Sequence, residues 1–266
     1  MIRKLATLAA ALGTVATLVV PAVAQAANAG AVLYDSTPAP GTVSIPSMGP
    51  EAYSFNQLGN EVLLHSHTAP IRHVSVTMES WACQTGSWQS SCTTTPGAKF
   101  TVPITLNLYR HAKSNSGTGE VKPGRLIASV TKTFRIKYRP SSSSTSESRF
   151  LGTDGQYHNG IAQNIEFPVN RQLPNDVVWT VGYDTNTSGT NPLGHVSPAD
   201  SLNIGLAPKV RVGHDRFPDS IFWDTRYAGF TCGAPFVTGE LNRDGACNGT
   251  ANSWAGFVPA VRFSTH

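Results

Sequence analysis

His73-Val74-Ser75-Val76-Thr77-Met78-Glu79 is the stretch of sequence that decides the fold. Apolar side chains alternate with polar ones along it, as in a β-strand that buries one face. The same alternation recurs at five other places, within residues 104–109, 134–139, 165–169, 202–206 and 257–263. The repetition predicts many strands, each with one face to bury.

The segment from Val177 to Tyr183 is apolar almost throughout. It predicts either a central strand covered on both sides or a wall on which Trp179 and Tyr183 point outward together. Charged residues are only 14%, while 24 Gly and 18 Pro favour turns, and no stretch has a capped helical period. We therefore expect an all-β protein, a single antiparallel β-sandwich of jelly-roll type with long Ser/Gly/Pro-rich loops.

The first 26 residues have the organisation of a secretory signal peptide. Arg3 and Lys4 precede an apolar run from Leu5 to Val20, and Ala24-Gln25-Ala26 offers a cleavage site. The run is shorter than the roughly 20 residues of a spanning helix. We expect a secreted, extracellular chain of residues 27–266, one β-sandwich domain rather than two, without stable membrane insertion.

The charge of the chain argues against nucleic acid as a partner. Removing residues 1–26 leaves 18 basic against 16 acidic residues, a formal charge of +2. Only Lys132, Arg135, Lys137 and Arg139 lie close together. We expect them on a solvated strand face, with a polyanion-binding face as the alternative. The oligomeric state does not follow from the sequence.

Four cysteines in an exported chain predict two disulfides. Spacing favours Cys83 with Cys92 and Cys232 with Cys247 among the three possible pairings. Each bond would close a short loop and stabilise the fold by about 2.5 to 3 kcal/mol. The alternative, a four-thiolate zinc site, has no CxxC pair to support it.

Aromatic and polar residues gather near both predicted disulfide loops. A flat ring can stack on a sugar while amide and carboxylate groups bond its hydroxyls, so an extracellular polysaccharide or cell-surface component is the predicted partner. The simpler interpretation of the rings themselves is that they fill the ends of the core. The candidate ligand-binding residues are Trp81, Trp88, Gln84, Trp223 and Asp224, and further residues of this kind near the loops are Gln89, Phe230, Phe236, Asn242 and Asp244.

One pattern resembles half of a metal motif. Gly59 followed by His65-Ser66-His67 is similar to the first half of the metal motif of cupins, and His65 and His67 on a strand would share a face. The glutamate that should follow is absent, and the second half is approached only by residues 192–195. Histidines at the surface of an edge strand are the simpler interpretation.

No catalytic motif is present in the sequence, and we expect no cofactor. Two carboxylates in a groove would suit glycoside hydrolysis, with Glu79, Glu166, Asp219 and Asp224 as candidates. Acidic loop residues could also hold a structural Ca²⁺, although turn capping explains most of them. The candidates for this ion are Asp215, Asp219 and Asp224, or Asp184 with Asp200.

Several segments resemble a group of uncharacterised secreted bacterial proteins, chiefly actinobacterial. They are residues 53–62, 74–83, 103–109, 134–140, 159–165, 200–203 and 259–263, and they extend over most of the mature chain. Residues 103–124 are also similar to jelly-roll modules of surface-anchored bacterial proteins. The resemblance implies export and a β-sandwich but no activity. Relatives have an additional cysteine pair around residues 141–160, so we expect a looser segment here.

Three functions are compatible with these sequence features. We prefer a non-catalytic module that binds extracellular polysaccharide or a cell-surface component. The alternatives are a secreted hydrolase or metal-dependent, cupin-like enzyme, and a purely structural envelope protein. The positions of the five tryptophans discriminate among these functions, because sugar stacking requires exposed rings.

Overall fold

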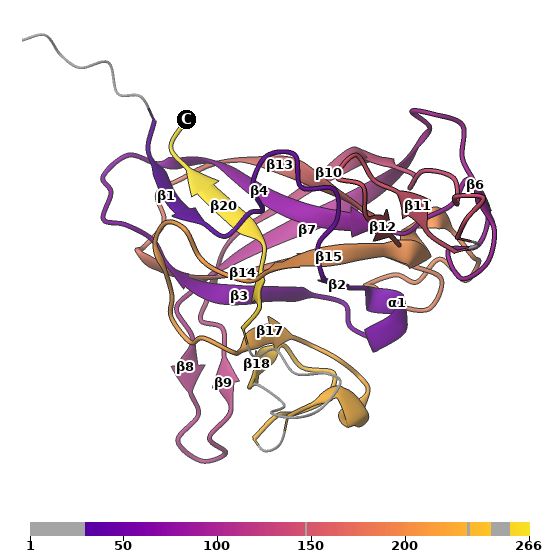
Figure 1. Ribbon diagram of the computed structural model, residues 1–266. Helices are drawn as coiled ribbons and strands as arrows, with labels where there is room; N and C mark the ends of the chain where they lie inside the picture. Colours follow the sequence, from indigo (N-terminus) through magenta and orange to yellow (C-terminus); the bar gives the residue numbers. More distant parts are fainter. Residues whose placement is uncertain (1–29, 147, 233–234, 246–255) are drawn as a thin grey trace, which may run out of the picture.

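The structure is a computed structural model that describes residues 30–146, 148–232, 235–245 and 256–266 (Figure 1). The predicted signal peptide lies outside the described residues. The all-β prediction is confirmed, because antiparallel strands dominate the described part of the chain. Most of these strands belong to two seven-stranded sheets.

The first sheet, which we name sheet A, is organised around its longest central strand, β4. It consists of β1 (Val32–Asp35), β2 (Ser47–Met48), β4 (Ile71–Ser80), β13 (Ile161–Arg171), β15 (Leu202–Ala207), β19 (Val258–Pro259) and β20 (Val261–Ser264). β13 pairs with β4 from Ile161 to Arg171, with an irregularity between Pro168 and Arg171. The other edge of β4 pairs with β20 along residues 73–76 and with β15 along residues 78–80. β1 then pairs with β20.

The second sheet, sheet B, has β14 between β3 and β7. It consists of β3 (Leu58–Leu63), β7 (Lys99–Arg110), β10 (Leu126–Lys137), β14 (Asp176–Gly182), β16 (His214–Asp215), β17 (Ile221–Trp223) and β18 (Asn242–Asp244). β10 pairs only with β7, whereas β16 and β17 both pair with β3. β10 is therefore an edge strand.

One hydrophobic core fills the space between the sheets. Val74, Val76 and Met78 of β4 are fully buried in it, as their alternation predicts. Phe134 of β10 meets Phe167 of β13 with ring centroids 4.9 Å apart, so the two sheets are in direct contact. Burying each of these two rings stabilises the fold by about 1.5 to 3 kcal/mol.

β14 is buried on both faces, which confirms the central-strand interpretation of this segment. Val177 and Trp179 point into the core, and Val178 on the opposite face is also fully buried. Tyr183 is buried and donates a hydrogen bond from its hydroxyl to the Leu202 carbonyl. The alternative of an outward wall was therefore wrong.

The edges of the two sheets are joined by side chains of β10 and β13. The Gln163 Nε2 donates to the Arg135 carbonyl, and its Oε1 accepts from the Lys137 backbone N–H, both at 3.1 Å. Lys132 donates from its Nζ to the Glu166 carbonyl at 2.9 Å. Backbone groups at both edges are thus satisfied across the gap between the sheets.

Arg139 does not lie on the solvated face that the sequence predicts. Its side chain is fully buried, donates to the Ser148 carbonyl at 2.8 Å, and lies 5.5 Å from the centre of the Phe150 ring. The strand β10 ends at Lys137, so the alternation that predicts exposure does not continue to Arg139. Arg135 and Lys137 are exposed as expected.

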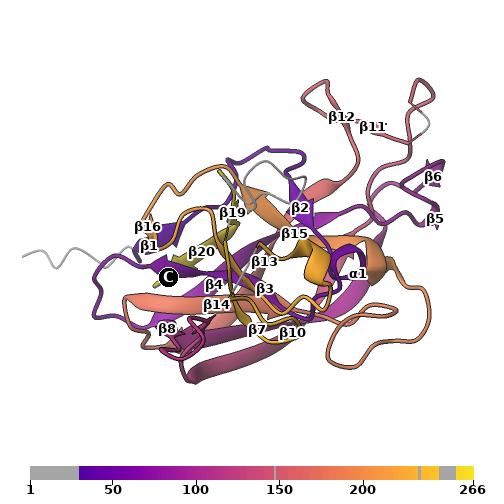
Figure 2. The ribbon, with the colours of Figure 1, turned by 90° about the horizontal axis from the view of Figure 1, so that it is seen from below.

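Short elements extend from the ends of the sheets. They are the hairpins β5 (Thr85–Gly86) with β6 (Cys92–Thr93), β8 (Lys113–Ser114) with β9 (Val121–Lys122), and β11 (Phe150–Leu151) with β12 (Tyr157–His158), and the helices α1 (Pro50–Tyr53), η1 (Pro198–Ser201) and η2 (Ala228–Phe230). The β5–β6 and β11–β12 hairpins lie at the same end of the molecule in both views (Figures 1 and 2). This end carries the candidate site.

Candidate functional site

The first predicted disulfide, Cys83 with Cys92, is confirmed, with the two Cα atoms 5.4 Å apart. It closes the segment 83–92, which we name the disulfide loop and which contains β5 and the start of β6. The Ser87 N–H donates to the Ser91 carbonyl and closes the turn. Gly86 has φ +86, and a Cβ there would lie 2.0 Å from the Ser91 carbonyl oxygen, so the tight turn requires glycine.

Trp81 and Trp88 form an edge-to-face pair at the base of the disulfide loop. Their ring centroids are 4.7 Å apart and their planes meet at 69°, a favourable aromatic geometry. Both rings are half-buried. Gly160 lies against the indole of Trp81, since a Cβ at that position would be 2.1 Å from Trp81 Cδ1. Trp81 therefore supports Trp88 from the protein side.

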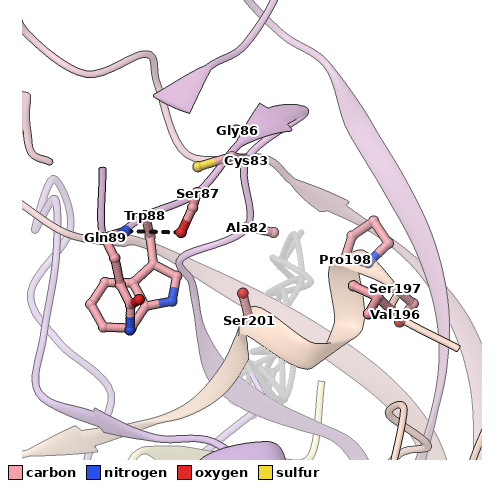
Figure 3. A pocket seen from close by; sticks show the side chains of 10 residues that line it. All are labelled: Ala82, Cys83, Gly86, Ser87, Trp88, Gln89, Val196, Ser197, Pro198 and Ser201. Carbon is pink, nitrogen blue, oxygen red and sulfur yellow. Dashed lines mark hydrogen bonds between the residues drawn. The ribbon is translucent and has the colours of Figure 1, made fainter. Parts of the chain in front are cut away.

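Beside Trp88 lies an open pocket of about 460 Å³, which we name the Trp88 pocket (Figure 3). The disulfide loop contributes one wall, and residues around η1 contribute the other. Figure 3 shows Trp88 and Gln89 on one side and Pro198 on the other, with Ser201 between them. The residues that line it are Ala82, Cys83, Gly86, Ser87, Trp88, Gln89, Val196, Ser197, Pro198 and Ser201.

Hydrogen bonds hold the two walls of the Trp88 pocket in place. The backbone N–H of Trp81, two residues before the disulfide loop, donates to the Ser201 carbonyl at 2.9 Å and so joins this part of the chain to η1. Ser197 caps η1 by accepting from the Ala199 N–H, and the Asp200 carboxylate accepts from the Ser197 N–H. The pocket is thus formed before any ligand arrives.

Gln84 is exposed, but its side chain has a structural role. The Gln84 Oε1 accepts from the Thr95 N–H at 2.9 Å, and the Gln84 N–H donates to the Thr94 hydroxyl at 3.3 Å. These bonds connect the disulfide loop to the chain after β6. Gln84 does not line the Trp88 pocket, whereas its neighbour Gln89 does.

Trp223 and Asp224 do not belong to a surface site. Trp223 is fully buried, and its Nε1 donates to the Asp244 carboxylate at 3.1 Å. Asp224 is buried and accepts from the backbone N–H groups of Asn56 and Gln57. Burial raises the pKa of Asp224, and these hydrogen bonds oppose the rise. The prediction that Trp223 and Asp224 face a ligand was wrong, because Trp223 belongs to the interior strand β17 and Asp224, which follows it, is buried as well.

The second predicted pairing includes Cys247, which lies outside the described residues, as does Trp254. Asn242 and Asp244, expected near an exposed loop, are buried. Asp244 accepts from the Cys232 N–H, and Asn242 donates to the carbonyls of Val237 and Glu240. These polar groups therefore hold Cys232, Val237 and Glu240 to β18.

The two candidate metal-binding histidines lie in a loop. β3 ends at Leu63, so His65 and His67 follow the strand instead of sharing one of its faces. The His67 Nδ1 lies 3.1 Å from the His65 carbonyl. No group of three or more His, Cys, Asp or Glu within the described residues is arranged to hold a metal ion.

The acidic candidates for calcium or catalysis are engaged in other contacts. Asp215 accepts from the Asn60 amide and the Phe217 N–H, and Asp184 accepts from the Asn191 N–H. Glu79 and Glu166 occupy register positions four residues apart on the paired strands β4 and β13, about 13 Å along the strand direction. That exceeds the separation of the acid pair in glycoside hydrolases, about 5 to 9.5 Å.

Glu79 is a buried acid whose environment the sequence does not reveal. It points away from the core, but the segment before β2 covers it, and it accepts from the Ser44 hydroxyl at 2.6 Å and the Ile45 N–H at 3.4 Å. Burial raises its pKa from 4.5 to about 8, although both hydrogen bonds oppose the rise. Glu79 therefore keeps its proton near neutral pH.

Burial also raises the pKa of two other acidic residues in sheet B. Burial is the largest cause at Glu61, whose pKa rises to about 7 beside Asp176, and at Asp215, whose pKa rises to about 6. Arg243 lies 3.9 Å from Glu61 and opposes its rise. Neither acid lines the Trp88 pocket.

Sequence reasoning found the disulfide loop but missed the facing wall of the Trp88 pocket. Val196, Ser197, Pro198 and Ser201 follow Trp88 by more than a hundred residues. Among them, only the Ser197-Pro198-Ala199-Asp200 capping pattern is a local signal, and it predicts a helix start but no site.

The disulfide is typical of a protein that folds in an oxidising compartment. In the part of the chain that the structure describes, no helix is long and apolar enough to span a membrane. No family model matches this chain, and no similar protein is found among the curated proteins or the solved structures.

Proposed function

We propose that this protein is an exported, non-catalytic binding protein that holds a saccharide unit of an extracellular polysaccharide or cell-surface component in the Trp88 pocket. The observation that carries the proposal is the half-buried Trp88 ring, which Trp81 supports on one side and which borders an open pocket on the other. A flat ring held in this way can stack on the apolar face of a pyranose.

The polar groups around the ring fit the same ligand. The hydroxyls of Ser87 and Ser201 and the amide of Gln89 lie at the pocket, so they can bond sugar hydroxyls. No Lys, Arg, Asp or Glu lines it. A neutral sugar is therefore a better match than an ionic ligand, and its affinity should depend little on salt.

We also propose a jelly-roll sandwich as the frame of this site. Numbering β1, β3, β4, β7, β10, β13, β14 and β20 as strands one to eight gives the order 1-8-3-6 in sheet A and 2-7-4-5 in sheet B. This order is that of two Greek keys wound into a jelly roll. In this frame β15 and the short strands β2, β16, β17, β18 and β19 are additions.

Export completes the proposal. It is supported by the basic, apolar and small-residue pattern of residues 1–26 and by the disulfide at the proposed site. The disulfide loop is itself a wall of the pocket. Binding therefore requires the oxidised protein.

The test is retention of the oxidised protein on a panel of insoluble polysaccharides and cell-wall preparations at low and high salt. We expect salt-resistant retention on at least one polymer and its loss in Trp88→Ala. Tyr227→Ala is the control, because Tyr227 is an aromatic residue that is 55% exposed and does not line the pocket. Melting temperatures of both variants equal to that of the wild type would show that folding is intact. Retention of Trp88→Ala at the wild-type level would refute the site.

A further inference from the structure

A second pocket is lined by the chain that follows the disulfide loop and by the segment around Tyr138. It has a volume of about 580 Å³, within the range of small-molecule sites. We name it the lysine pocket. It is lined by Thr94, Pro96, Gly97, Ala98, Lys99, Lys137, Tyr138, Pro140, Ser141 and Ile161, and it shares no residue with the Trp88 pocket.

Hydrogen bonds fix the walls of the lysine pocket. The Ser141 hydroxyl accepts from the Thr94 N–H at 2.9 Å and donates to the Thr94 carbonyl at 3.2 Å. The Tyr138 N–H donates to the Ala98 carbonyl at 3.2 Å, which joins the two sides of the pocket. The ring of Tyr138 rests on Phe100 with centroids 5.0 Å apart. A ligand would therefore find a preformed pocket, and ordering would cost it little affinity.

The inner surface is apolar and flat at several places. The Tyr138 ring is half-buried, and Pro96, Pro140 and Ile161 surround it. Aromatic and proline rings favour a planar ligand body, because both offer a flat apolar face. The shape thus selects for an aromatic ring over a branched chain.

Two positive charges stand at this apolar surface. Lys99 of β7 and Lys137 of β10 are directly opposite each other in the strand register, and both are exposed. Like charges at directly opposed positions destabilise an antiparallel pair. Within the described part of the chain neither lysine forms an ion pair. An anion bound near both would remove this repulsion.

We infer that the lysine pocket binds a small aromatic carboxylate. The ring lies on Tyr138 between the prolines, and the carboxylate accepts charge-assisted hydrogen bonds from Lys99 and Lys137. This site is separate from the proposed saccharide site in residues and in ligand charge, so either can fail without the other.

The test uses 3-phenylpropionate and its neutral isostere 3-phenylpropanamide, titrated into the ¹⁵N-labelled full protein at low salt. We expect the carboxylate to bind about tenfold more tightly than the amide. As the carboxylate is added, the backbone N–H signals of Ala98, Lys99 and Tyr138 should shift until the site is saturated. Acetate, which has the charge without the ring, should not saturate. Equal affinity of the two phenyl ligands, saturation by acetate, or shifts confined to other residues would overturn the inference.

A variant without the two lysine charges distinguishes binding in the lysine pocket from nonspecific attraction of the carboxylate to the protein. Lys99→Gln with Lys137→Gln should lose the tenfold preference for the carboxylate while it still binds the amide. Lys113→Gln is the control, because Lys113 is an exposed strand lysine outside the pocket. The inference is refuted if the control loses the preference as well, or if the double variant keeps it with an unchanged melting temperature.

Discussion

Replacing Glu79 by glutamine should remove a large part of the pH dependence of stability. Its side chain is fully buried under Ser44 and Ile45, and burial raises its pKa from 4.5 to about 8. Between these two values the unfolded chain releases the proton while the folded protein retains it. The contribution of Glu79 to the free energy of unfolding is therefore fully present below pH 4.5 and is lost as pH rises through 8.

The size of the effect follows from the difference between the two pKa values. At about 1.4 kcal/mol for each pKa unit, the free energy of unfolding falls by about 5 kcal/mol in total because of Glu79 alone, as pH rises from well below 4.5 to well above 8. The pKa values of Glu61 and Asp215 are also raised, so these two residues add to the loss of stability as pH rises. The pKa of Asp35 is lowered from 3.8, despite the opposing effect of its burial, by its hydrogen bonds with Thr37 and Arg262; its contribution is lost only in stronger acid.

Urea unfolding followed by tryptophan fluorescence at pH 5 and pH 8 measures the effect. Between these values, Glu79→Gln should lose about 4 kcal/mol less stability than the wild type, because the neutral amide has no proton to release. Glu240→Gln is the control, since Glu240 is exposed and paired with Lys122, which stays charged over this range. An equal loss in Glu79→Gln and in the wild type would refute this account of Glu79.

Three other changes test the packing. Gly160→Ala would place a Cβ 2.1 Å from an atom of the Trp81 ring, and thermal unfolding should show a stability loss of about 1 to 3 kcal/mol. Trp223→Phe should cost about 1 to 3 kcal/mol more than Trp179→Phe in urea unfolding, because only Trp223 loses a hydrogen bond, to Asp244. Replacing both cysteines of the disulfide loop by alanine should lower the free energy of unfolding by about 2.5 kcal/mol, measured in the same way. Wild-type stability in any of these variants would contradict the corresponding contact.

The faces of the strands could be predicted from the sequence, but not what covers them. The alternation around Val76 identifies the core face of β4 correctly, because side chains of a strand alternate strictly. The same pattern places Glu79 away from the core, yet the segment before β2 buries it. Such covering depends on contacts between distant segments, which leave no periodic signal in either one.

Only the local part of the candidate site could be predicted from the sequence. The Cys83–Cys92 spacing identifies the disulfide loop and Trp88 with it, because a short closed loop is a local feature. Trp223 is a tryptophan near polar residues, as Trp88 is, but it is buried because the strand that carries it, β17, is interior. Whether a ring is exposed depends on which strand of the sheet carries it, and the residues next to it do not determine that.

The two hydrogen bonds of Gln163 have a consequence for how copies of the chain meet. A long unpaired strand edge is a template on which another chain can build a strand, and β10 has twelve residues. The amide of Gln163 satisfies the Arg135 carbonyl and the Lys137 N–H as an incoming strand would. One side chain thus protects that end of β10 against edge-to-edge aggregation, which matters most at high protein concentration.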